Sequence, residues 1–146
     1  MSMPLRRLLL LALLLAVLGA LAWAALAPLA PGPNRDELFD IPNGTWARRM
    51  AGDKVDILPG EITLTLGLRD ILLLRNSDKV PQQFGPVLIM PGQDFRLPFE
   101  QVSENSFDCT AHASGQMLIK VVAMPAPGWQ RLRWRLQALD RTLRDH

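Results

Sequence analysis

The chain has 146 residues, a net charge of +2, 49% hydrophobic residues and a single cysteine. This length holds one domain of about 100 residues with appendages, and the lone cysteine excludes an internal disulfide. The segment from Pro31 to Pro127 holds nine basic and twelve acidic residues, so the positive excess lies at the two ends. Nucleic-acid-binding domains carry their positive charge on the domain itself, so we expect no nucleic-acid partner.

The first feature along the chain is an uncharged apolar run from Leu8 to Ala27, preceded by Arg6-Arg7. About 20 apolar residues are enough for a helix to cross a bilayer, and the arginines place the amino end in the cytoplasm. We therefore expect residues 1–30 to be a single-pass anchor of the cytoplasmic membrane, with the remainder periplasmic. Small residues near the end of the run permit the alternative of a signal peptide whose cleavage releases a periplasmic form. The run exceeds the usual apolar length of such peptides, about 7–15 residues, which favours the anchor.

The middle of the chain divides into a short connecting part and a β-rich part. Residues 31–54 are expected to be a linker and pre-domain segment, with one helical turn at Thr45–Ala51 that Gly52-Asp53 ends. Residues 55–124 alternate apolar and polar positions between clusters of turn residues, which predicts six or seven short strands and a β-sandwich. The expected strands cover residues 62–66, 71–74, 84–90, 95–99, 107–109 and 118–122.

The carboxyl-terminal part, residues 125–146, predicts a basic amphipathic helix entered through Pro125-Ala126-Pro127-Gly128. Leucines recur at helical spacing on one face and arginines occupy the others. Such a helix either packs on the sandwich or lies on a membrane surface or a partner protein. The residues expected to make a membrane or partner contact are Trp129, Leu132, Trp134, Leu136, Leu139, Leu143, Arg131 and Arg135.

Near the end of the β-rich part, three side chains that bind soft metals stand on one loop. The spacing is Cys109-x2-His112-x4-Met117. Thiolate and thioether ligands beside an imidazole are the set that copper prefers. A structural zinc site needs four ligands, and no second cysteine or histidine pair accompanies this loop. Cys-His catalysis needs a third, orienting group within reach and finds little support here, so we expect no enzyme.

The same loop resembles that of the cupredoxin, or blue-copper (plastocyanin-like), family. Upstream, the segment Asn76-Ser77-Asp78-Lys79-Val80-Pro81-Gln82-Gln83-Phe84 is similar to the family pattern N-x-D-x-x-P-H-x-F, and Pro91-Gly92 is similar to the turn that follows it. The resemblance covers roughly residues 55–123. It implies an all-β, Greek-key cupredoxin-like β-sandwich, one copper ion held by Cys109, His112 and Met117, and a role in electron transport.

The sequence departs from the family pattern at one ligand. Gln82 stands where the resemblance implies a second histidine, and the only other histidine is His146. An amide oxygen is a poor ligand for Cu(I) and does not replace an equatorial imidazole. The three remaining ligands suffice for Cu(I), and Met90, before Pro91-Gly92, is a further residue that could lie near the metal.

Two hypotheses about function follow. In the first, a membrane-anchored periplasmic domain binds copper through Cys109, His112 and Met117 for electron transfer or Cu(I) delivery to a membrane oxidoreductase. In the second, the chain is a metal-free accessory or scaffold subunit of a larger respiratory or photosynthetic membrane complex. Bound copper in the isolated protein would separate the two.

Overall fold

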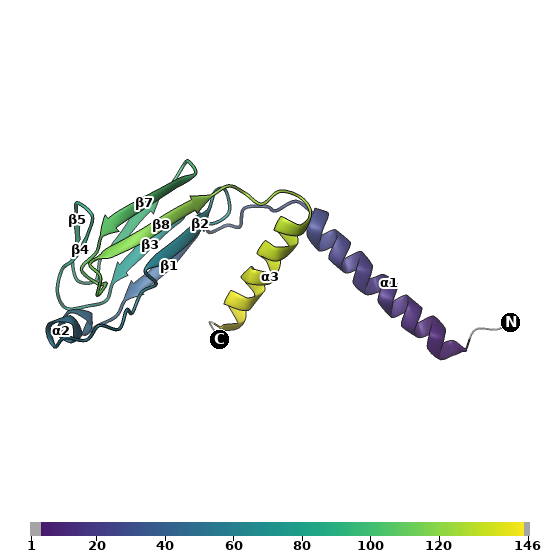
Figure 1. The fold of residues 1–146 in the computed structure, drawn as a ribbon. Helices are drawn as coiled ribbons and strands as arrows, with labels where there is room; N and C mark the ends of the chain where they lie inside the picture. Colours follow the sequence, from purple (N-terminus) through teal and green to yellow (C-terminus); the bar gives the residue numbers. More distant parts are fainter. Residues whose placement is uncertain (1–3, 145–146) are drawn as a thin grey trace. The chain divides into compact units, whose positions relative to one another are not determined.

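A computed structural model describes residues 4–144 of the chain. These residues form two units: α1 with α3, and the β-domain Pro31–Met124. The helices are α1 (Leu5–Leu26), α2 (Thr45–Met50) and α3 (Trp129–Arg144). The strands are β1 (Asp36–Ile41), β2 (Glu61–Thr65), β3 (Ile71–Asn76), β4 (Gln82–Phe84), β5 (Val87–Ile89), β6 (Asp94–Pro98), β7 (Ser103–Asp108) and β8 (Gln116–Val122) (Figure 1).

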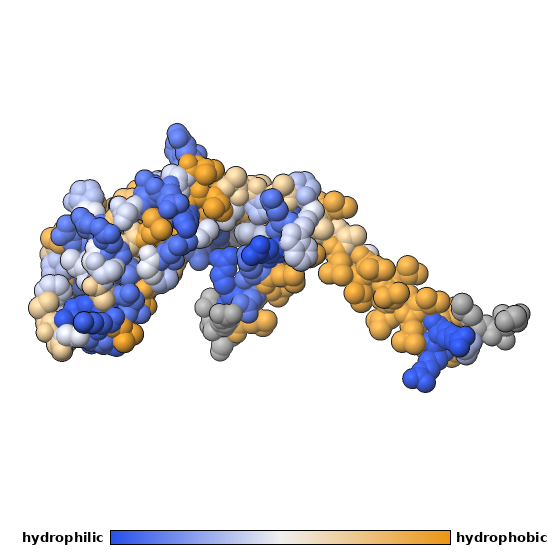
Figure 2. Space-filling view, in the orientation of Figure 1, coloured by the Kyte–Doolittle hydropathy of each residue, from blue (hydrophilic) through white to orange (hydrophobic). Residues whose placement is uncertain are grey.

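Helix α1 is long and apolar enough, by its length and composition, to cross a membrane. Its leucines and alanines are strong helix formers, and it ends before Pro28, because the residue preceding a proline is biased out of the helical conformation. Figure 2 shows a continuous hydrophobic surface along α1 that turns hydrophilic at the amino end. The helix has the length and composition of either a membrane anchor or a signal sequence.

The β-domain contains two three-stranded sheets, in the orders β1-β3-β6 and β2-β8-β7, and the short hairpin β4-β5. Both sheets contribute to one hydrophobic core. Leu72 and Leu74 of β3 face it from the first sheet, and Leu64 of β2 and Ile119 of β8 face it from the second. The all-β sandwich expected from the sequence, flanked by an amino-terminal and a carboxyl-terminal helix, is confirmed.

The β-domain begins earlier than the sequence suggested. The expected pre-domain segment, residues 31–54, contains β1, which pairs in parallel with β3 from Asp36↔Ile71 to Ile41↔Asn76. Strand β1 is an edge strand with three acidic residues, so its local pattern is weak and its place in the sheet comes from the pairing with β3. The expected helical turn within the same segment is confirmed as α2.

A second difference concerns the strand expected at residues 84–90. The structure divides this region into β4 and β5, which form an antiparallel hairpin. Gly85 occupies the turn with a φ of 53°, a left-handed value that side-chain-bearing residues rarely adopt. Its N–H donates to the carbonyl of Asp108 at 2.7 Å, which holds the hairpin turn against the end of β7.

Candidate metal centre

The loop carrying Cys109, His112 and Met117 joins two antiparallel strands, β7 and β8. The last register pairs are Phe107↔Met117 and Asp108↔Gln116, and beyond them the Cys109 N–H donates to the Gly115 carbonyl at 2.8 Å. Gly115 has a φ of 75°, which lets the chain reverse. The hairpin thus returns Met117 to the strand that delivers Cys109.

The face of the sheet that carries the sulfur atoms is the inner one. Side chains alternate along a strand, and Glu104 and Asp108 of β7 are exposed. Cys109 therefore points inward, as Phe107 does. Cys109 and Met117 belong to the same hydrophobic core cluster, so the loop places both a thiol and a thioether in the interior.

All three candidate ligands are buried. The exposed fractions are 2% for Cys109, 3% for His112 and 0% for Met117. Burial raises the pKa of the Cys109 thiol, while the backbone N–H groups of Ala111 and His112 act in the opposite direction. A thiol in such surroundings is protonated at neutral pH, and a metal ion would have to displace that proton.

The His112 imidazole is held in one tautomer. Its Nε2 lies 3.0 Å from the carbonyl oxygen of Pro59, and because a carbonyl only accepts, Nε2 must carry the proton. In the neutral ring Nδ1 then holds a lone pair. Nδ1 is buried and has no hydrogen-bond partner within residues 4–144. A buried nitrogen without a partner is uncommon in folded proteins, and a lone pair of this kind is what a metal ligand supplies.

The end of α2 and the chain after it contact the loop from outside. The Arg49 guanidinium donates from Nη2 to the Ala111 carbonyl at 2.9 Å and from Nη1 to the Asp53 carbonyl at 2.8 Å. Asp56 accepts the Ala113 N–H at 2.7 Å. Sequence reasoning missed Arg49, Asp56 and Pro59, because they lie in or near the segment assigned to a linker and no local pattern connects them to the loop.

Gln82 lies beside the ligand loop, and both polar atoms of its amide are hydrogen-bonded. Its Oε1 accepts the Thr110 hydroxyl at 2.6 Å and its Nε2 donates to Asp78 Oδ2 at 3.1 Å. Thr110 also accepts the backbone N–H of Gln83 at 2.9 Å. Gln82 therefore faces Thr110, the residue that follows Cys109, as expected for the position of a second histidine. Its polar atoms form hydrogen bonds within the protein.

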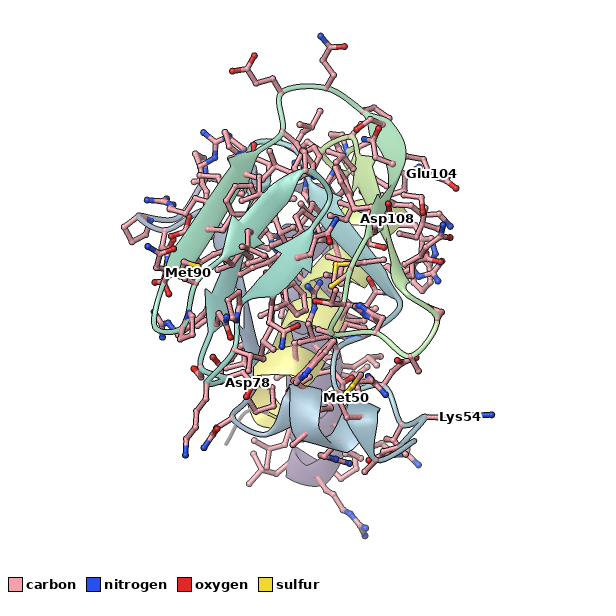
Figure 3. The ribbon with its side chains drawn as sticks, turned by 90° about the vertical axis from the view of Figure 1, so that its left-hand side faces the viewer. Met50, Lys54, Asp78, Met90, Glu104 and Asp108 are labelled. Carbon is pink, nitrogen blue, oxygen red and sulfur yellow. The ribbon has the colours of Figure 1, made fainter. Side chains whose placement is uncertain are left out.

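Asp78 connects the Gln82 amide to the start of α2. Its carboxylate accepts the N–H groups of Gly44 at 2.9 Å and of Trp46 at 2.8 Å, and Figure 3 places it at the end of the β-domain beside α2. Burial disfavours the charged form, but these bonds, with those from Lys79 and Gln82, outweigh burial and lower the pKa of Asp78. Asp78 of the sequence motif thus has a structural role.

The other predicted residues lie away from this loop. Met90 follows β5 at the outer edge of the domain and is 44% exposed (Figure 3), and His146 lies outside the described residues. In α3 the large apolar side chains of Trp129, Leu136, Leu139 and Leu143 are exposed, and Leu132 and Trp134 are half-buried. Arg131 and Arg135 donate to carbonyls at the end of α1.

The residues of the loop suit a soft metal ion. Within the part of the chain that the structure describes, no group of three His, Cys, Asp or Glu side chains converges as a metal site. A site here would depend on one thiolate, one imidazole and one thioether, a set suited to copper and poorly suited to hard cations such as Mg²⁺ or Ca²⁺. The unpartnered Nδ1 of His112 fits such an ion.

Comparisons with known proteins find similar solved structures at low sequence identity. No family model matches the sequence, and no curated protein matches it either. Among solved structures, a purple cupredoxin from Nitrosopumilus maritimus is 22% identical, covers 60% of this chain and 100% of its own, and has a TM-score of 0.39. A mutant of amicyanin in the oxidized state is 17% identical, covers 43% of this chain and 70% of its own, and has a TM-score of 0.35. Another amicyanin mutant, with Cu(I), is 16% identical, covers 65% of this chain and 91% of its own, and has a TM-score of 0.41.

Proposed function

We propose that this chain is a membrane-anchored, extracytoplasmic copper protein that holds one Cu(I) ion through Cys109 Sγ, His112 Nδ1 and Met117 Sδ. The observation that carries the proposal is the buried, unpartnered lone pair of His112 on the same hairpin as a buried thiol and a buried thioether. Each of these atoms is individually compatible with an ordinary core. Their combination in one loop is the donor set of a soft metal.

The protein supplies orientation and exclusion of water. The Pro59 carbonyl fixes the tautomer and the orientation of the His112 ring, as an outer partner does for a metal-binding histidine. Arg49 fixes the loop between Cys109 and His112 by binding the Ala111 carbonyl. A copper ion bound here would supply one-electron redox chemistry or serve as cargo.

The monovalent state is favoured by what surrounds position 82. Cu(II) takes nitrogen and oxygen ligands in tetragonal geometry, or two imidazoles and one thiolate in a trigonal plane. Gln82 offers no imidazole, and its amide already bonds Thr110 and Asp78. Two sulfur atoms and one nitrogen suit Cu(I), which accepts low coordination numbers.

The proposed membrane anchor bears on the class of partner. If α1 spans the cytoplasmic membrane, the β-domain with its copper loop lies on the periplasmic side. We infer that the partner is a membrane oxidoreductase, which receives either electrons or the Cu(I) ion itself.

Copper titration of the full-length protein in detergent, under anaerobic conditions, tests the proposal directly. We expect one Cu(I) ion per chain in competition with a chromophoric Cu(I) chelator, and no intense visible absorption with Cu(II). A protein that binds neither ion at stoichiometric copper would contradict the proposal and leave the metal-free accessory subunit as the better hypothesis.

The substitution Gln82→His is expected to create a Cu(II) site with a visible thiolate-to-copper absorption. An imidazole at this position faces the loop, because the present side chain bonds Thr110, next to Cys109. Optical and electron paramagnetic resonance spectra after addition of Cu(II) would measure the change. Gln83→His, on the exposed face of the same strand, is the matched control. Identical spectra for the two variants would contradict the assignment of position 82.

The substitution Met117→Leu is expected to weaken Cu(I) binding at least tenfold, whereas Met90→Leu leaves it unchanged. Both replace a thioether by a side chain of similar volume, which usually costs less than about 1.5 kcal/mol of stability in a core. Met117 lies in the core of the hairpin and Met90 at the domain edge. Chelator competition at equal protein concentration gives both affinities. Equal weakening by both variants would mean that the thioether of Met90 also contributes.

A further inference from the structure

The carboxyl-terminal helix and the apolar helix are joined at one place, the last turn of α1. A helix leaves its last four carbonyl groups without partners inside the helix, and these are the carbonyls of residues 24–27. Each accepts a hydrogen bond from the tail. Ala24 is bonded by Arg135, Ala25 by the Gly128 N–H at 2.9 Å, Leu26 by Arg131 at 3.0 Å, and Ala27 by Arg131 at 3.1 Å and Arg135 at 3.0 Å.

The charges at this junction are complementary. The carbonyl end of a helix carries a partial negative charge that nearby cations stabilise, and α1 has no basic residue in its own last turn. Arg131 and Arg135 supply two. The Arg135 guanidinium also lies over the Trp23 ring, 5.2 Å from its centroid, in the geometry of a cation–π contact. The tail thus caps the carboxyl end of α1, whose last carbonyl groups have no partner within the helix.

The junction also limits where α3 can lie. The hydrogen bonds that Arg131 and Arg135 donate end on carbonyls between Trp23 and Pro28, and the described residues of α1 before Trp23 are exposed. Helix α3 therefore starts at the carboxyl end of α1. If α1 spans a bilayer, as proposed above, this end lies at the border between hydrocarbon and head groups, where tryptophan is enriched.

At that level α3 presents one apolar stripe, spaced three and four residues apart. It consists of Trp129, Leu132, Leu136, Leu139 and Leu143, and all but Leu132 are largely exposed. The opposite side of the helix carries the exposed Gln130, Gln137 and Arg141 beside the half-buried Trp134. An exposed apolar stripe opposite a mostly polar side is the pattern of a helix lying in the plane of the interface.

We propose that α3 is the second half of the membrane anchor: it closes the outer end of α1 through Arg131 and Arg135, and its apolar stripe rests in the lipid of the same membrane. This inference rests on the proposed membrane span of α1. It also makes α1 a retained anchor, because cleavage after the apolar run would remove the partners of both arginines.

Site-directed spin labelling of the full-length, metal-free protein in phospholipid vesicles tests the proposal. Labels are attached at Leu136→Cys, in the stripe, and at Gln137→Cys, on the far side. Cys109 is buried, so the unsubstituted chain gives the labelling background. Power saturation with oxygen, which enters lipid, and with a water-soluble nickel chelate reports the depth of each label.

We expect the label at position 136 to relax mainly with oxygen and the label at position 137 mainly with the nickel chelate. The accessibility ratio, oxygen over nickel chelate, should be at least threefold higher at position 136 than at position 137. Equal nickel accessibility at both positions would overturn the lipid contact. Shielding of position 136 from both reagents would also overturn it, because a protein surface, such as a second copy, then covers the stripe.

Paired arginine variants test the junction. Arg131→Ala with Arg135→Ala is expected to lower the accessibility ratio at position 136 to that at position 137. Arg133→Ala with Arg141→Ala removes the same charge elsewhere on α3 and is expected to leave the ratio unchanged. Equal effects of the two pairs would mean that head-group attraction alone, without capping of α1, positions the helix.

Carbonate extraction of the same vesicles distinguishes a failure of the membrane span of α1 from a failure of the lipid contact of α3. Release of the protein by carbonate would show that α1 does not span the membrane, so the proposed anchor itself fails. Retention together with a water-exposed stripe would overturn only the placement of α3. The copper proposal is unaffected by either outcome, because no metal is present in these measurements.

Discussion

Replacing Cys109 with alanine is expected to abolish Cu(I) binding at stoichiometric copper. The thiolate is the strongest donor of the proposed set. Removing it should cost more than the roughly 10–100-fold loss that follows removal of an outer partner of a metal ligand. Chelator competition under anaerobic conditions would measure the affinity of the variant beside that of the unsubstituted chain.

The control for this variant is the integrity of the fold. Cys109 packs in the core as a small hydrophobic residue, so its truncation should lower the free energy of unfolding by about 1 kcal/mol and leave the β-sheet circular dichroism unchanged. A folded Cys109→Ala variant that retains Cu(I) affinity within twofold would contradict the assignment of the thiol as a ligand.

Replacing Asp78 with alanine is expected to lower the free energy of unfolding by about 3 kcal/mol at pH 7. The variant leaves the N–H groups of Gly44 and Trp46, which open α2, and the Gln82 amide without their acceptor. An unsatisfied buried donor costs roughly 1–3 kcal/mol. Urea denaturation in mild detergent, followed by tryptophan fluorescence, measures the change. Asp94→Ala is the control, since its pair with Arg75 is exposed and such pairs contribute about 0–1 kcal/mol.

The same variant has an expected pH signature. The pKa of Asp78 is lower in the folded protein than its ordinary value of about 4. Its contribution to stability is therefore present above that value and is lost as the pH falls through the folded pKa. The difference in unfolding free energy between the two proteins should shrink from pH 7 to pH 3. A constant difference over this range would show that the Asp78 charge does not stabilise the fold.

Asp78 and the residue next to Cys109 are connected through one series of hydrogen bonds. Asp78 joins the start of α2 to Gln82, Gln82 joins Thr110, and Thr110 follows Cys109 in the chain. Arg49, at the other end of α2, returns to the loop at the Ala111 carbonyl. Helix α2 is thereby fixed over the candidate metal loop from both sides. A loss of Asp78 is expected to loosen the cover as well as the fold.

Local patterns predicted several features that the structure confirms. The uncharged run of leucine and alanine predicts a long helix because nothing in it favours another conformation, and α1 spans Leu5–Leu26. Alternation around Leu64 and Leu97 predicts strands, and both lie in strands. The 3.6-residue recurrence of leucines in the tail predicts α3. These features depend on periodicity and propensity within one segment, which a sequence displays directly.

Other features required the folded chain. Strand β1 is weakly patterned, and only its pairing with β3 brings Asp36–Ile41 into the sheet. Pro59 lies 53 residues from His112, and Arg49 lies 62 residues from Ala111. Such partners have no spacing that a linear pattern can reveal, because the path of the intervening chain determines their separation.

The sequence by itself therefore determined that this chain has an apolar helix, a β-rich domain, an amphipathic tail and a loop with three soft donors, because each is a property of neighbouring residues. Only the tertiary structure decided that Gln82 is engaged by Asp78 and Thr110, that His112 Nδ1 keeps a free lone pair, and that the tail caps the end of α1. Hydrogen bonding between distant segments decides these contacts. It depends on where the backbone carries each group and is not encoded in local periodicity.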